Sequence, residues 1–148
     1  MNILLLPKTV QHAIQIMVHI AMIPKNSLTN VSKISEESNI PKSYLAKIVQ
    51  ILASKKLIKT KTGRTGGVTL AKKSNQIKII DIVFAINDKR REKEMCIIGI
   101  DECNDKVHCP LHHSWKKIKK TIYNEFSIQT LDILIEELLK KKAQTKSH

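Results

Sequence analysis

The chain has 148 residues, enough for one domain with a hydrophobic core, or for a small domain plus a dimerisation element. It has no apolar run long enough to span a bilayer. The ILLL stretch at residues 3–6 is too short for a signal peptide and follows no basic residue, so we expect a cytoplasmic protein without a membrane partner. Its odd number of cysteines, three, argues against a disulfide framework.

The net charge of +13 is concentrated in the first half of the chain. Residues 1–80 carry 13 Lys and Arg against two acids, a balance of +11, whereas residues 81–148 carry 13 against 11, a balance of +2. A half this basic is typical of a surface that binds a polyanion. Because aromatic residues make up only 3% of the chain, few rings can stack on unpaired bases, which favours duplex DNA over RNA or single strands. A basic membrane-surface protein is disfavoured, since the charge does not follow one strongly amphipathic helix.

Two helices are predicted before residue 40. Apolar residues recur at helical spacing over residues 8–23, and Pro24 ends that run. A shorter helix carrying Val31 and Ile34 follows, with Thr29 or Asn30 as its cap. Asn39 suits the left-handed turn at its end, and Ile40 is expected to be a core residue.

A third helix is predicted to open at Pro41, with one apolar stripe and a small, basic opposite face. Two short helices joined by a tight turn, the second with such a face, form a helix-turn-helix. The outer face would enter the major groove of DNA, and the expected contacts come from Ser43, Tyr44, Lys47 and Gln50. An ordinary solvated helix is the alternative. Against it, residues 42–64 hold seven basic residues and no acid.

Residues 57–70 predict a β-hairpin, with the strands LIKTK and VTL on either side of the turn TGRTGG. A hairpin appended to a helix-turn-helix is a wing. Arg64 at its tip suits a narrow minor groove or the neighbouring phosphates, and Lys61 is a further expected DNA contact. The turn lacks the G-x-x-x-x-G-K-[ST] pattern and leads into a strand, which argues against a nucleotide-binding loop.

All three cysteines, Cys96, Cys103 and Cys109, lie in one stretch that His112 follows closely. A helix is predicted to begin at Cys109, because Pro110 suits a first helical position, and this places His112 on the same face as Cys109. These side chains are four candidate ligands for an iron-sulfur cluster, with [2Fe–2S] favoured over [4Fe–4S]. Structural zinc is the weaker metal, since no C-x2-C pair is present. The alternative without a metal is that the three cysteines are free thiols.

The fold class predicted is mostly α with a small β-hairpin wing, a winged helix-turn-helix plus a long C-terminal dimerisation helix. Residues 1–87 would form the DNA-binding domain, which includes a short helix over 77–86, and residues 88–109 a charged linker and the cysteine loop. Residues 110–148 would form the dimerisation helix and a final helix over about 128–141. One apolar stripe on the dimerisation helix suits a twofold partner and consists of Leu111, Trp115, Ile118, Ile122 and Phe126.

With these elements in view, the sequence resembles the Rrf-two family of bacterial winged-helix regulators over nearly its whole length. The resemblance rests on the amphipathic first helix, the IPKSYLAKIVQIL helix, the GRTGG wing and the three-cysteine loop that leads into CPLHHSW. It implies a homodimer that binds a palindromic operator and changes its affinity as a cluster is gained, lost or damaged. The alternative from another class is an enzyme or small-molecule binding module, but no paired carboxylates, activated nucleophile or nucleotide loop is visible in the sequence.

 The predicted function is therefore that of a DNA-binding transcription regulator that acts as a repressor, and not that of an enzyme.

In the IscR type of this family, the resemblance implies that a histidine completes the ligand set of three cysteines, and His112 matches that position. The NsrR type uses an aspartate in the first helix of the partner subunit instead, whereas this chain has Gln11 near that place. The chain departs from the family pattern in three places. The first cysteine gap is six residues where the IscR type has five, Thr62 stands where many relatives have arginine, and Val68 replaces an aromatic residue.

Overall fold

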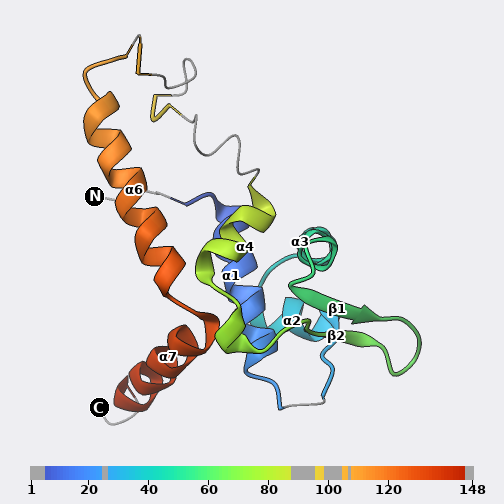
Figure 1. The fold of residues 1–148 in the computed structure, drawn as a ribbon. Helices are drawn as coiled ribbons and strands as arrows, with labels where there is room; N and C mark the ends of the chain where they lie inside the picture. The colour runs from blue at the N-terminus through green and yellow to red at the C-terminus, as the bar shows by residue number, and fades with distance from the viewer. Residues whose placement is uncertain (1–5, 25–26, 88–95, 99–104, 107, 146–148) are drawn as a thin grey trace.

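The computed structural model describes residues 6–24, 27–87, 96–98, 105–106 and 108–145, and the fold below is that of these residues. Two strands form an antiparallel hairpin, and the other elements are helical (Figure 1). In chain order the elements are α1 (Lys8–Ala21), α2 (Val31–Ser38), α3 (Lys42–Ser54), β1 (Ile58–Lys61), β2 (Gly67–Leu70), the 3-10 helix η1 (Ser74–Gln76), α4 (Ile79–Ile86), α6 (His112–Ile128) and α7 (Leu131–Thr145).

Helix α1 runs through the middle of the molecule and packs against α2, α3, α4, α7 and the hairpin. The apolar stripe predicted for this helix consists of Val10, Ala13, Ile14, Met17, Ile20 and Ala21. Four of these side chains are buried and Ile14 and Ala21 are half-buried, while Ile16, which lies outside the stripe, is fully buried. The stripe is therefore wider than the sequence pattern indicated, because α1 is covered on several sides and not on one face only.

The turn between α2 and α3 forms as the sequence predicts. Asn30 is the cap of α2, since its Oδ1 accepts a hydrogen bond of 2.7 Å from the backbone N–H of Lys33. Asn39 has φ of 54°, the left-handed conformation expected there, and Ile40 is buried. The apolar stripe of α3 then faces the core and consists of Leu45, Ile48, Val49 and Leu52.

The hairpin pairs Ile58 with Leu70 and Lys61 with Gly67, as the wing prediction requires. Thr29 extends this sheet by one residue, because its N–H and carbonyl exchange hydrogen bonds with Val68 at 3.2 and 2.7 Å. A Cβ atom at Gly67 would lie 2.5 Å from the Thr29 carbonyl oxygen, so the close approach of the two backbones requires glycine there. The base of the wing is thus fixed to the chain segment that precedes α2.

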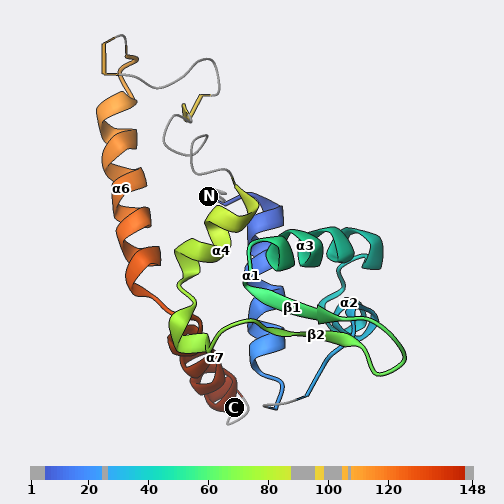
Figure 2. The same cartoon turned by 45° about the vertical axis from the view of Figure 1, so that its right-hand side comes forward.

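Helix α6 runs beside α4 and ends in a junction with α7 that is bonded to the rest of the domain (Figures 1 and 2). At this junction Ile79 donates to the Gln129 carbonyl at 3.0 Å, and Leu131 donates to the Ile77 carbonyl at 2.8 Å. The Leu131 side chain is fully buried in the main core, and the rings of Phe84 and Tyr123 pack between α4 and α6. The His112 end of α6 lies at the opposite end of that helix from the junction (Figure 2).

Several predictions for the second half of the chain can be compared with the fold. The helix predicted over 77–86 is α4, and the last two predicted helices are α6 and α7, with ends shifted by a few residues. The charged linker at residues 88–94 and Cys103 lie outside the described residues. In the part of the chain that the structure describes, no helix combines the length and the apolar character that a bilayer crossing requires.

The burial of Leu131 generates a stability prediction. Leu131→Ala should lower the free energy of unfolding by about 2 to 5 kcal/mol, because it leaves a cavity where α7 joins the core. Leu139→Ala, the same substitution on a side chain of α7 that is 48% exposed, is the matched control and should change it by less than about 1 kcal/mol. Urea denaturation at one protein concentration measures both, and equal losses would contradict this packing.

Candidate functional site

The outer face of α3 is open to solvent where the sequence predicts contacts with DNA. Ser43, Lys47 and Gln50 are exposed, and the residues between them on the opposite face are buried in the core. Short polar and basic side chains on an exposed helix of this kind can approach base edges in a major groove.

Tyr44, the fourth residue predicted on this face, has a contact inside the protein. Its side chain is half-buried, its hydroxyl donates a hydrogen bond of 2.9 Å to Thr9 Oγ1, and its ring meets His12 edge to face at 5.6 Å. Since Thr9 and His12 belong to α1, Tyr44 ties the N-terminal turn of α3 to α1. If the Tyr44 hydroxyl also contacts DNA, it has to do so while it is hydrogen-bonded to Thr9.

The wing carries further basic side chains beside α3, because β1 packs against α3. Lys61 and Arg64 are both exposed, Arg64 in the turn between the strands. All seven basic residues of segment 42–64 are exposed, and this segment has no acidic residue: Lys42, Lys47, Lys55, Lys56, Lys59, Lys61 and Arg64. We call these seven side chains the basic surface. Without carboxylates among them, their charge is available to a polyanion.

The cysteine site is described only in part, because Cys103 lies outside the described residues. Cys96 and Cys109 are both half-buried. Helix α6 begins at His112, and the prediction that it begins at Cys109 was wrong by three residues. Pro110 and Leu111 form a turn instead, which the N–H of His112 closes on the Cys109 carbonyl at 3.0 Å. Cys109 and His112 are therefore held close together by one turn of backbone.

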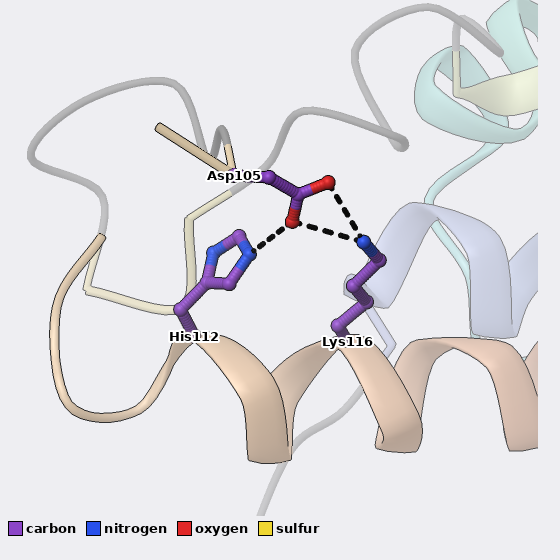
Figure 3. A network of polar contacts seen from close by, with 3 residues as sticks. All are labelled: Asp105, His112 and Lys116. Carbon is purple, nitrogen blue, oxygen red and sulfur yellow. Dashed lines mark hydrogen bonds and ion pairs between the residues drawn. The ribbon is translucent and has the colours of Figure 1, made fainter. Parts of the chain in front are cut away.

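His112 is the one buried side chain in α6 and is 5% exposed. Its Nε2 lies 2.9 Å from Oδ1 of Asp105, and Lys116 Nζ donates to both oxygens of the same carboxylate at 2.9 Å (Figure 3). The hydrogen bonds from Lys116 and His112 lower the pKa of Asp105 to about 2, so this carboxyl is ionised at neutral pH. The sequence analysis missed Asp105, since nothing in its spacing marks it among the acids of the loop.

The other ring nitrogen of His112, Nδ1, is buried and has no hydrogen-bond partner in the described part of the chain. A buried nitrogen without a partner is costly unless it meets a ligand, and imidazole nitrogen is a good ligand for iron. No group of three or more His, Cys, Asp or Glu among the described residues is arranged to hold a metal ion. The donor chemistry nevertheless fits an iron-sulfur centre, because His112 is joined to Cys109 by one backbone turn and its Nδ1 has no partner among the described residues.

Two further histidines surround His112. The ring centroids of His108, His112 and His113 are 4.8 to 5.4 Å apart, and both neighbours are exposed. His108 and His113 are therefore surface residues. Their rings cover part of the His112 ring and so help to keep it from water.

Comparisons with known proteins agree with this fold. NsrR, an HTH-type transcriptional regulator from Oceanobacillus iheyensis, is 28% identical over 137 residues, which cover 90% of this chain and 93% of that protein. CymR, the global cysteine regulator of B. subtilis, matches in structure with a TM-score of 0.74 at 19% identity, over 89% of this chain and 96% of CymR. IscR from T. potens matches with a TM-score of 0.71 at 20% identity, over 90% and 87% of the two chains.

The structural matches confirm the predicted fold class, a winged helix-turn-helix with a small β-hairpin wing and a long C-terminal helix. The relatives and the fold are those of regulators and not of enzymes, as the sequence predicted. The family model for Rrf2, described as an iron-dependent transcriptional regulator, matches residues 6–137. The chain therefore belongs to the Rrf2 family of DNA-binding transcription regulators.

Proposed function

We propose that this regulator is a homodimer whose affinity for a palindromic DNA operator is set by an iron-sulfur cluster on Cys96, Cys103, Cys109 and His112. The observation that carries the proposal is Nδ1 of His112, which is buried without a partner among the described residues, in a side chain one backbone turn from Cys109. When bound, the cluster would supply a centre that responds to iron supply, oxidants or nitric oxide. DNA binding, dimerisation and the coupling between them are assigned below to residues of the chain itself.

DNA binding is assigned to the basic surface. Ser43, Lys47 and Gln50 would face the major groove, while Lys61 and Arg64 of the wing would contact phosphates or the adjacent minor groove. Two-fold symmetry would place a second copy of α3 roughly 34 Å away, one helical turn along the duplex. A regulator that binds the chromosome in this way would act in the cytoplasm.

The dimer is assigned to the exposed side of α6. Leu111 and Ile118 of the predicted stripe are 51 and 43% exposed although they are large and apolar, which favours a partner that covers them. Phe126, the last residue of the predicted stripe, instead packs against the core of its own chain. The predicted stripe therefore contacts two different surfaces. We assign Leu111 and Ile118 to the contact with the second copy, and Phe126 to the core of its own chain.

The link between sensing and binding is mechanical. Cys109 and His112 lie at one end of α6, and the junction with α7 fixes the other end to the DNA-binding domain. Ligation at these residues would bind the cysteine loop to the start of α6. Because α6 would also hold the partner, its orientation would set the spacing of the two α3 helices and with it the affinity for an operator.

A second candidate keeps the DNA binding and replaces the cluster by a thiol or zinc switch. It is favoured by the structural match to CymR, because the Staphylococcus aureus CymR has been solved in an oxidised form. In this alternative Cys96 and Cys109 would change oxidation state or bind zinc, and the buried Nδ1 of His112 would have no role in sensing.

The basic surface can be tested by charge removal. Lys47→Ala and Arg64→Ala should each weaken binding to a duplex selected from random DNA with the protein itself. Each should also reduce the slope of log affinity against log salt by about one, since each removes a contact with the polyanion. Lys142→Ala, which removes the same charge from the exposed end of α7, is the control and should leave both quantities unchanged. Unchanged binding in both test variants would refute this docking surface.

The cluster can be tested by analysis of protein purified without oxygen. We expect iron together with about equal acid-labile sulfide, and a visible absorption band that disappears when all three cysteines are replaced by serine. Zinc without sulfide, or no metal at all, would instead support the thiol or zinc switch and reject the cluster.

A further inference from the structure

The contacts of His112 distinguish its two ring nitrogens. Nε2 is 2.9 Å from the Asp105 carboxylate, whereas Nδ1 is buried without a partner in the described residues. In Figure 3 the second nitrogen lies on the side of the ring away from Lys116. The protein therefore offers one nitrogen for a hydrogen bond and leaves the other for a different interaction.

The carboxylate determines where the ring hydrogen lies. An ionised carboxylate can only accept hydrogen bonds, so Nε2 must carry the hydrogen and donate it to Asp105. In a neutral imidazole the other nitrogen, Nδ1, is then unprotonated and presents a lone pair. This is the form of histidine that binds a metal.

Lys116 holds the carboxylate in this role. It lies one helical turn after His112 in α6, and its ammonium group donates to both oxygens of Asp105 at 2.9 Å (Figure 3). The bidentate contact fixes the direction of the carboxylate. It also balances the negative charge, which would otherwise repel a centre built on thiolates.

We propose that Asp105 is a positioning residue, which holds His112 with its hydrogen on Nε2 so that Nδ1 is the atom that binds the cluster, and that Lys116 anchors Asp105. This inference rests on the proposed function. Histidines that bind metals commonly donate their other N–H to a carboxylate, and loss of that second partner typically weakens metal binding by about 10- to 100-fold.

His108 and His113 are the competing histidines. Both rings lie within 5.4 Å of the His112 ring centroid, but both are exposed, so water can satisfy their nitrogens. Neither has a buried nitrogen without a partner in the described part of the chain. The burial and the carboxylate contact thus select His112 among the three.

The first test uses protein without a cluster. Nitrogen-15 NMR at mildly alkaline pH should show His112 with its hydrogen on Nε2, with the signals assigned by their loss in His112→Ala. In Asp105→Ala the two tautomers should both be populated, because the acceptor is gone. Asp105 is 70% exposed, so this variant should fold normally, as circular dichroism would check. A hydrogen on Nδ1 in the unaltered protein would overturn the proposal.

The second test identifies the nitrogen bound to the cluster. Protein with histidine labelled by nitrogen-15 at Nδ1 alone, or at Nε2 alone, is loaded with iron and sulfide and reduced, and nitrogen couplings are measured by pulsed electron paramagnetic resonance. The strong coupling should change with the Nδ1 label only. It should be lost in His112→Ala and kept in His113→Ala. Coupling that follows the Nε2 label would overturn the proposal.

The third test measures how long the cluster persists when a chelator is added. Asp105→Ala and Lys116→Ala should lose it at least several-fold faster than the unaltered protein, whereas Lys117→Ala, which removes the neighbouring exposed lysine, should not. Equal lifetimes in all variants would overturn the role of Asp105 while leaving the cluster itself established. If the unaltered protein takes up no cluster, the proposed function fails, and that outcome is distinct from a failure of Asp105.

Discussion

The short backbone pairing between residues 77–79 and 129–131 is the constraint on which the arrangement of the molecule depends. Two hydrogen bonds, Ile79 to Gln129 and Leu131 to Ile77, join the α6–α7 junction to the start of α4. Leu131 then places α7 in the core beside α1. Because this end of α6 is fixed and α6 also packs against α4, we expect a change at its His112 end to reach α3 through the direction of α6 and its contact with α4. The pairing thus fixes the end of α6 that is opposite to His112.

The basic surface and the cysteine site obey different physical requirements. DNA binding needs exposed charge, and the seven basic side chains of segment 42–64 are all exposed. A metal ligand must have a free lone pair and a fixed orientation, and the burial of His112 and its contact with Asp105 are consistent with that need. The two requirements are met in different elements, the basic surface on α3 and the wing and the cysteine site at the start of α6, and α4 packs against both α3 and α6.

Much of the fold could be predicted from the sequence because local signals and packing agree. The left-handed turn at Asn39, the glycine-rich wing and the stripe of α3 follow from local conformation and periodicity. The hydrogen bond from Tyr44 to Thr9 could not be predicted, since it joins residues 35 positions apart on the surface of two helices. The start of α6 was misplaced because Pro110 fits a turn as well as a first helical position. Asp105 was missed since only the folded loop brings it to His112.

The central claim is that the state of the cysteine site controls the affinity for DNA. The direct measurement compares, without oxygen, the affinity of cluster-loaded and cluster-free protein for one duplex selected from random DNA, at one salt concentration. The account predicts that the two affinities differ by about 5-fold or more, the range of typical coupling between sites, and that the triple cysteine-to-serine variant matches the cluster-free protein. Equal affinity of all three proteins for that duplex would contradict it.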